Sequence, residues 1–118
     1  MAGEGLFIGW GQVPRGREQK ALEVFNESVA YWGSLQQNGT VESLDVVLLG
    51  LHGGDLYGFA LLRGEPEKLE EVQRTEDWQR HIGRASLVVD GLGVVPAVSG
   101  EALGEQMALY QQVVAELG

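Results

Sequence analysis

Three side chains of this sequence have the type and setting that proton-transfer chemistry requires: His52, His81 and Asp90. His52 precedes Asp55 by three residues, with two glycines between them. A histidine beside a carboxylate can act as a base that its partner orients. The same residues also suit a plain turn, in which the glycines reverse the chain, the carboxylate bonds backbone amides and the histidine is solvated. Turn composition alone accounts for the segment, so the second interpretation is the simpler one.

His81 and Asp90 each allow two interpretations as well. A helix over residues 76–86 places His81 one turn from Trp78, where it could face a pocket. Alternatively, His81 pairs on the helix surface with Asp77, four residues earlier. Asp90 interrupts an apolar run, so it lies either at a strand bulge or in the interior as a buried carboxylate. We expect no metal site, because two histidines far apart in the chain fall short of the three or four ligands required.

Positive charge is concentrated in the segment that holds Arg74, Arg80 and Arg84. A guanidinium group can bind a carboxylate or phosphate through two parallel hydrogen bonds. Glu70 and Glu76, however, precede Arg74 and Arg80 by four residues. Pairs at this spacing lie side by side on a helix. Intrahelical ion pairs are therefore the favoured use of these arginines.

Composition limits the partners and cofactors. Among 118 residues, 17 are acidic and 8 basic, and the net charge of −9 argues against nucleic acid or an anionic membrane as partner. There is no cysteine, which excludes disulfides and thiolate metal sites. The pairs Gly9/Gly11 and Gly91/Gly93 lack the third glycine of a dinucleotide fingerprint. No phosphate loop is found either, so we expect no cofactor. Without a secretory leader or a membrane-length apolar run, the sequence predicts one cytoplasmic domain over residues 1–118.

The elements that must position these residues follow from periodicity. Alternating apolar residues between glycines and prolines indicate strands, and apolar residues at steps of three and four indicate helices. In the segment 17–37 the stripe is Leu22, Phe25, Val29 and Trp32. Thr75 has the character of a fresh helix N-cap. The expected order is strand 6–13, helix 17–37, strands 41–51 and 55–63 around a tight turn at 52–54, helices 66–74 and 76–86, strand 87–98 and helix 101–117.

This order predicts an α+β fold, a ferredoxin-like βαββαβ sandwich with an extra C-terminal helix. In an antiparallel sheet with one wet face, strand positions alternate apolar and polar. Here the run from Val46 to Leu51 is apolar on both faces. Helices cover one face only, so a second copy of the chain is the simplest cover for the other. The sequence thus predicts a homodimer formed by the open face of the sheet.

With this order of elements and a sheet that is apolar on both faces, the chain resembles the dimeric α/β-barrel superfamily, in which two ferredoxin-like subunits pack sheet against sheet. The hairpin at 52–54, the segment TEDWQRHIGRAS at 75–86 and the strand VVDG at 88–91 are most similar to small bacterial proteins of uncharacterised function. The resemblance implies relatives that include cofactor-free monooxygenases, haem-degrading enzymes, lactone isomerases and binding proteins. None of the polar constellations of the enzyme branches can be matched here, so no catalytic residue is carried over.

Function is therefore predicted from a pocket. Trp10 lies on a glycine-bearing strand, Tyr57 begins the strand after the hairpin, and Trp78 and His81 share a kinked helix. We expect any pocket to be lined by these three aromatic residues, with His81 as its nearest polar group. The first hypothesis is a homodimer that binds a small apolar or aromatic molecule. The alternative is a cofactor-independent enzyme of the monooxygenase or isomerase type, with His52, His81 or Asp90 as base.

The C-terminal segment carries a regular apolar stripe. Its members recur at steps of four, three, four and three, which indicates a packed helix. We expect this helix to pack through Leu103, Met107, Tyr110, Val114 and Leu117, with Glu105, Gln111 and Gln112 in water. Its use in binding another protein is a third hypothesis.

Overall fold

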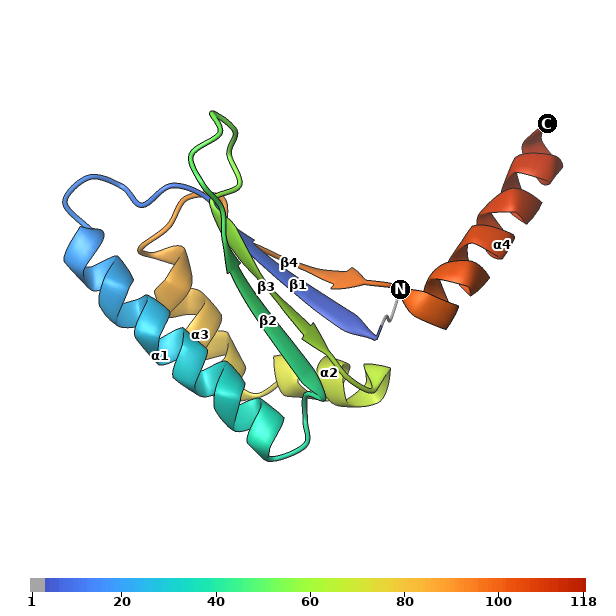
Figure 1. Cartoon of the computed structure of the whole chain (residues 1–118). Coiled ribbons are helices and arrows are strands. Elements are labelled where there is room, and N and C mark those ends of the chain that lie inside the picture. The colour runs from blue at the N-terminus through green and yellow to red at the C-terminus, as the bar shows by residue number, and fades with distance from the viewer. Residues whose placement is uncertain (1–3) are drawn as a thin grey trace.

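The structure, a computed structural model, describes residues 4–118 of the chain. Four strands and four helices alternate in the expected order (Figure 1). Their bounds are β1 Gly5–Trp10, α1 Glu18–Gln37, β2 Ser43–Leu48, β3 Gly58–Arg63, α2 Pro66–Gln73, α3 Glu76–Ser86, β4 Gly93–Ala97 and α4 Gly100–Leu117. No helix of the described residues is long and apolar enough to cross a membrane.

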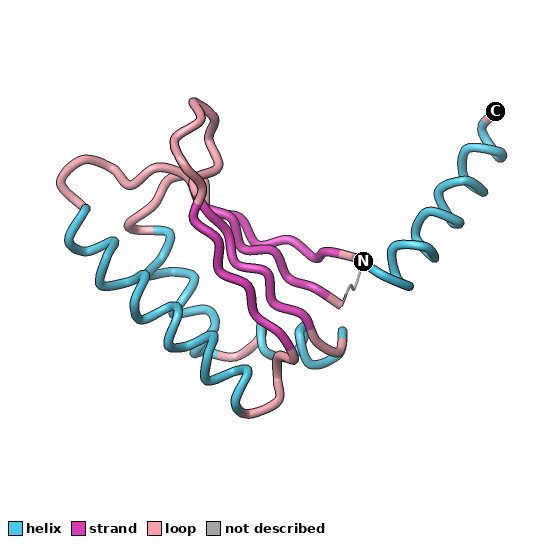
Figure 2. The backbone as a smooth tube through the Cα atoms, viewed as in Figure 1, coloured by secondary structure: helices cyan, strands magenta, loops and turns pink. Residues whose placement is uncertain are grey.

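The four strands form one antiparallel sheet in the order β2-β3-β1-β4. Helices α1, α2 and α3 lie on one side of this sheet (Figure 2). Strand β3 lies between β1 and β2, so the β1–α1–β2 unit is a split βαβ crossover. The predicted α+β ferredoxin-like fold is thus confirmed.

The core lies between the sheet and its helices. Leu6, Ile8, Ala60 and Leu62 alternate along β1 and β3 on the face that the helices cover, and all four are buried. The helices meet them with Trp32, Leu35, Leu69, Val72 and Trp78, which are also buried. Burial of each large side chain stabilises the fold by about 1.5–3 kcal/mol. This cluster fixes the helical layer on which the site is built.

The side of α1 that faces the sheet is shifted by about one residue from the predicted stripe. The buried residues are Ala21, Val24, Ser28, Trp32 and Leu35. The predicted stripe was wrong at Leu22, whose side chain is 55% exposed. Because Ala21 and Val24 face the core, Leu22 lies outside it, at the edge of the helical layer.

Two other boundaries differ from expectation. The tight turn at 52–54 is wrong, because β2 ends at Leu48 and β3 begins at Gly58, with a loop over 49–57. Strand 87–98 is shorter than predicted and begins only at Gly93. Gly53 and Gly91 have positive φ values of 80° and 64°, which interrupt extended backbone at both places.

The break between α2 and α3 lies where the N-cap signal predicted it. Thr75 is extended, with φ −72° and ψ 151°, and its Oγ1 accepts a hydrogen bond from the backbone N–H of Trp78 at 3.2 Å. An N-cap of this kind contributes about 1 kcal/mol to a helix. It also sets where α3 begins, and hence where Trp78 and His81 lie.

The second face of the sheet is mostly apolar, and no helix of the described residues covers it. Its apolar residues are Phe7, Val47, Phe59, Leu61 and Val95, which alternate with the core positions along the four strands. Asp45 and Arg63, which form an ion pair at 3.4 Å, lie on the same face. Phe7 and Phe59 stack with ring centroids 5.2 Å apart. We call this surface the open face.

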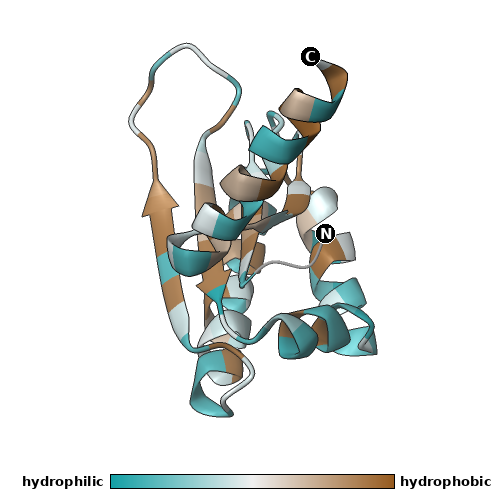
Figure 3. Ribbon diagram, turned by 90° about the vertical axis from the view of Figure 1, so that its right-hand side faces the viewer, coloured by the Kyte–Doolittle hydropathy of each residue, from teal (hydrophilic) through white to brown (hydrophobic). Residues whose placement is uncertain are grey.

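Helix α4 forms as predicted but does not pack on its own chain. Its large apolar residues are exposed, from Leu103 at 46% to Leu117 at 87%. Among the described residues no other helix or strand contacts it, and it projects away from the sheet (Figures 1 and 3). The expected packing of this helix is therefore wrong for the single chain, since the five-residue stripe has no partner within it.

Candidate active or ligand site

A group of aromatic rings lies between α1 and the C-terminal end of β1. Trp10 at the end of β1 meets Phe25 edge to face at a centroid distance of 6.1 Å and stacks near Trp32 at 6.5 Å. Its cross-strand partner is Gly58. A Cβ at Gly58 would lie 2.7 Å from Cζ2 of Trp10, so the glycine is needed for the indole to lie flat over β3. The indole of Trp10 therefore lies between the sheet and α1.

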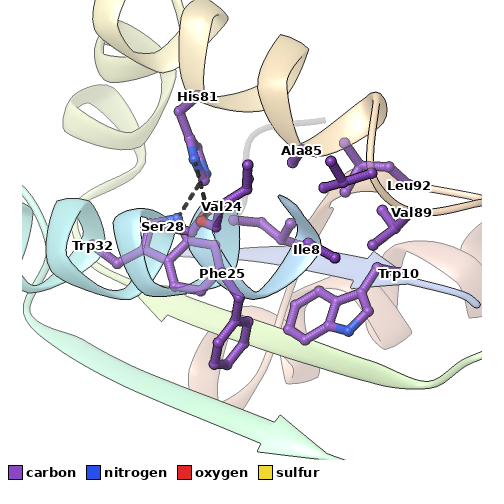
Figure 4. A pocket seen from close by; sticks show the side chains of 12 residues that line it. Ile8, Trp10, Val24, Phe25, Ser28, Trp32, His81, Ala85, Val89 and Leu92 are labelled. Carbon is purple, nitrogen blue, oxygen red and sulfur yellow. Dashed lines mark hydrogen bonds between the residues drawn. The ribbon is translucent and has the colours of Figure 1, made fainter. Parts of the chain in front are cut away.

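Behind these rings is a small inner cavity of about 50 Å³. Side chains from β1, α1, α3 and the loop before β4 surround it (Figure 4). The lining is apolar except for Ser28 and His81, and it consists of Ile8, Trp10, Ala21, Val24, Phe25, Ser28, Trp32, His81, Ala85, Val88, Val89 and Leu92. A space of this size admits only a few non-hydrogen atoms. It is too small to be a complete ligand site.

In front of the same rings is a larger open groove of about 440 Å³, which we call the outer groove. Trp10, Ala21, Phe25 and Val89 line both spaces, so these residues form the wall between them. The rest of the outer groove is lined by Gly11, Val13, Glu18, Leu22, Leu48, Leu49 and Tyr57. Tyr57 is held beside Trp10 because its backbone N–H donates to the carbonyl oxygen of Trp10 at 2.8 Å. This volume is within the usual range for small-molecule sites.

His81 is the polar group of the inner cavity, and both of its ring nitrogens face α1. The indole Nε1–H of Trp32 donates to Nε2 of His81 at 3.0 Å. Nδ1 lies 3.3 Å from Oγ of Ser28, whose hydroxyl donates to the carbonyl oxygen of Val24 at 2.8 Å. This network assigns the proton to Nδ1, which donates to Ser28.

The rings of Tyr31, Trp32 and Trp78 lie within 5.1–5.7 Å of the His81 ring centroid. They cover about half of the imidazole, and this burial lowers the pKa of His81 from 6.5 to about 4. His81 is therefore neutral at pH 7. Its one available lone pair, on Nε2, is occupied by Trp32, so in this conformation His81 has no free site with which to abstract a proton.

The structure places the predicted pocket residues in two groups. Trp10 and Tyr57 line the outer groove together, and Trp10 and His81 line the inner cavity together. Trp78 is buried behind His81, with ring centroids 5.7 Å apart, and it lines neither space. It supports His81 from the side opposite the cavity lining.

The other two candidate bases lie elsewhere. His52 is exposed in the loop 49–57, where one ring nitrogen is 2.6 Å from the carbonyl oxygen of Leu56 and the other accepts from the N–H of Gly54 at 3.1 Å. Loop backbone thus occupies both nitrogens of His52, whereas the turn interpretation expected a solvated histidine and a carboxylate that bonds the backbone. Asp90 is exposed in the loop before β4, so the buried-carboxylate interpretation is wrong. Its backbone pairs with Gly11 and Gln12 at 2.8 Å.

Ion pairs account for two of the arginines. Arg80 bonds Glu76 at 2.6 Å, which confirms the predicted intrahelical pair. Arg84 instead donates two bonds of 3.0 Å to Glu27 and joins α3 to α1. The predicted Asp77 partnership of His81 is wrong, because its nitrogens point to α1. Among the described residues no group of three or more His, Asp or Glu side chains could hold a metal ion.

Ser28 and Phe25 were not predicted as site residues. Both lie on α1, 53 or more residues from His81. The available signal was a serine in the middle of an apolar helix, which requires an acceptor when it is buried.

Comparison with solved structures shows the same fold at low sequence identity. A dimeric protein of unknown function and ferredoxin-like fold from Bacteroides fragilis aligns with a TM-score of 0.59, 9% identity, 77% of this chain and 90% of that chain. A mutant of the cofactor-independent oxygenase SnoaB from Streptomyces nogalater aligns with a TM-score of 0.54 and 14% identity, covering 79% of this chain and 91% of that one. An antibiotic biosynthesis monooxygenase homologue from Chloroflexus aurantiacus aligns with a TM-score of 0.51 and 14% identity, covering 81% of this chain and 94% of that one.

At these identities the likeness concerns the fold. It confirms the ferredoxin-like fold that the order of elements predicted. No protein-family model and no curated protein sequence matches the chain.

Proposed function

We propose that this protein is a homodimer that binds a small, neutral aromatic or apolar molecule in the outer groove. The observation that carries the proposal is the groove itself, a space of about 440 Å³ walled by Trp10, Phe25 and Tyr57 at the end of the helical layer. Aromatic walls offer large contact areas and stack with a planar ligand. The cytoplasmic location expected from the sequence belongs to the same proposal.

The charge of the ligand follows from Glu18, the one formally charged residue that lines the outer groove. Its carboxylate is held in place by the backbone N–H of Gly16, which donates to it at 2.7 Å. A fixed negative charge beside an apolar wall repels an anion and leaves a neutral molecule unaffected. The proposed ligand is therefore uncharged.

Titration with 1-naphthol and 1-naphthoate tests the proposal, because the two probes share a ring system and differ in charge. We expect 1-naphthol to quench tryptophan fluorescence saturably and to raise the melting temperature. At one hundred times its Kd a ligand adds about 2.7 kcal/mol to the free energy of unfolding. We expect 1-naphthoate to bind at least about tenfold more weakly, because of Glu18.

A matched pair of variants locates the binding. Leu22 is 55% exposed and lines the outer groove, whereas Leu87 is 69% exposed and lines no described cavity. Leu22→Lys should weaken 1-naphthol binding about tenfold, whereas Leu87→Lys should leave it unchanged. Equal effects of both variants, or no response to either probe, would exclude binding in the outer groove.

The homodimer is supported by the open face and by the dimeric ferredoxin-like neighbour. Five apolar side chains on the open face have no helix over them, and the Bacteroides fragilis protein of the same fold is described as dimeric. Exposed apolar surface on this scale typically marks an interface. Sedimentation equilibrium at micromolar concentration should give twice the mass of 12.8 kDa, and a stable monomer would contradict this part of the proposal.

A cofactor-independent oxygenase is the second candidate. It is supported by the fold shared with SnoaB and by the position of His81 and Ser28 at the inner end of the site. Because Nε2 of His81 accepts from Trp32, this function requires the indole to release the imidazole when substrate binds. Oxygen uptake with 1-naphthol that is lost in His81→Gln would favour the enzyme. Binding without oxygen uptake would favour the binding protein.

A further inference from the structure

Helix α4 has an apolar side that no other helix or strand of the described residues contacts. On a helical projection Leu103, Met107, Tyr110, Val114 and Leu117 share one side, flanked by Leu109 and Val113. All seven are exposed, at 42–87% of their surface. A helix of 18 residues is marginal in water by itself. Its stability must come from contacts that the single chain does not supply.

The dimensions of the chain show the same deficit. Its accessible surface is 7685 Å², whereas a compact monomer of this mass exposes about 6,300 Å². Its radius of gyration is 16.2 Å, whereas a compact domain of this length has about 13.5 Å. The excess of about 1,400 Å² per chain is comparable to what each subunit loses in an obligate dimer.

The direction in which α4 leaves the sheet is held by side-chain bonds. Both the backbone N–H and the hydroxyl of Ser99 donate to Oε1 of Glu4, the hydroxyl at 2.6 Å. The hydrogen bond from the Ser99 side chain is the main cause that lowers the pKa of Glu4, so the carboxylate is ionised. Ser99 directly precedes α4, two residues after the end of β4, and Glu4 directly precedes β1. These bonds tie the base of α4 to the end of the sheet.

From this base α4 rises on the side of the sheet opposite α1 and α3 (Figure 1). Seen from that side, α4 stands in front of the strands (Figure 3). The open face and α4 thus border one region, and both are apolar. A body that fills this region contacts both at once.

We propose that α4 is an arm that each chain extends onto a second copy of itself, whose sheet packs against the open face. This inference rests on the homodimer of the proposed function and adds the contact that secures it. The arm covers its apolar side on the partner's body, and by two-fold symmetry it receives the same cover in return.

The areas support a second copy as the occupant. Four strands about 4.8 Å apart and five or six residues long give the open face a flat footprint of about 350 Å² per chain. That is about 700 Å² of flat footprint for a sheet-to-sheet pair. A helix of 18 residues, about 27 Å long, adds a strip of about 270 Å² per chain. The arm therefore raises the flat footprint of the dimer by about three quarters.

Paramagnetic broadening between chains tests the arm directly. The chain has no cysteine, so Gln112→Cys on the polar side of α4 provides a unique position for a nitroxide. The spin-labelled chain without isotope is mixed in equal amounts with ¹⁵N-labelled wild type, so that any broadening crosses between chains. We expect strong broadening of amides in the sheet and helices of the ¹⁵N-labelled copy, removed when ascorbate reduces the label.

Two results would overturn the arm and leave the dimer in place. One is a dimer in which the mixture shows no broadening between chains. The other is broadening only within a chain that carries both label and isotope, which would place α4 back on its own open face. A chain that stays monomeric at all concentrations would instead contradict the homodimer itself.

Sedimentation of a matched pair of variants gives the energetic test. Tyr110→Lys puts a charge on the apolar side of α4, and Gln112→Lys puts the same charge on the polar side. We expect the first to weaken the dimer about 30-fold, the usual effect of losing a central tyrosine, and the second to change it less than about twofold. Equal effects would exclude the apolar side of α4 from the interface.

Discussion

Acid should destabilise this protein through His81, in a pH range above that of most carboxyl groups. In the folded chain the pKa of His81 is lowered from 6.5 to about 4 by burial. The unfolded chain therefore binds a proton at this ring at a higher pH than the folded chain does. The stability that the neutral ring contributes is complete above pH 6.5 and is lost as the pH falls from 6.5 to about 4.

The magnitude follows from the same two pKa values. For a fully buried ring the difference from 6.5 to about 4 corresponds to roughly 3 kcal/mol. His81 is half-buried, and solvent screening reduces the effect to about 1–2 kcal/mol. The protonated ring would also turn an N–H toward Nε1–H of Trp32, which then loses its acceptor.

Urea unfolding followed by tryptophan fluorescence, at fixed chain concentration, measures this at steps between pH 7.5 and 4.5. His81→Gln is the control, because its amide oxygen can still accept from Trp32 but does not titrate. Wild type should lose about 1–2 kcal/mol more than the variant over this range. Parallel curves for the two proteins, or an NMR titration of His81 with a midpoint near 6.5, would refute the assignment of the neutral, buried imidazole.

Three further predictions concern stability. Trp32→Phe leaves Nε2 of His81 without a donor, so we expect a loss of about 1–2 kcal/mol in urea unfolding and a higher His81 pKa by NMR; an unchanged pKa would argue against the bond. A Cβ at Gly11 would lie 2.8 Å and 2.9 Å from two backbone oxygens, whereas one at Gly33 in α1 meets nothing within 4 Å. Gly11→Ala should thus destabilise the fold by about 1–3 kcal/mol. Gly33→Ala should stabilise it by about 0.5–1 kcal/mol. Thermal unfolding that ranks the two variants in the reverse order would contradict the packing at Gly11. Thr75→Ala removes the acceptor for the first turn of α3 and should cost about 1 kcal/mol in the same assay, with a silent substitution showing that the cap is dispensable.

Local signals in the sequence were sufficient for the order of elements and for the fold. Thr75 predicts the start of α3 because capping depends only on a hydroxyl and the next three backbone amides. The apolar run from Val46 to Leu51 predicted an uncovered apolar face, but Leu49 to Leu51 belong to the loop and only Val47 of that run lies on the open face. Phe7, Phe59 and Leu61 of β1 and β3 supply most of that face instead. These features depend on geometry within a few residues, and the sequence displays that directly.

The candidate site depended on contacts between distant segments. Trp32 and Ser28 meet His81 across 49 and 53 residues, and no spacing rule marks such a meeting. Tertiary packing decided which side of α1 faces inward: Ala21, Val24 and Ser28 are buried, and Leu22 lines the outer groove. Tertiary packing also decided that Trp78 supports His81 and does not line a cavity.

Helix α4 shows the division most plainly. Its periodicity determines that a helix forms and which side of it is apolar, because these follow from 3.6 residues per turn. What that side contacts is not encoded in the period, since burial of apolar surface is non-directional and any apolar body of the right shape would serve. Only the tertiary structure, with Glu4 and Ser99 fixing the exit of β4, directs this helix away from its own sheet.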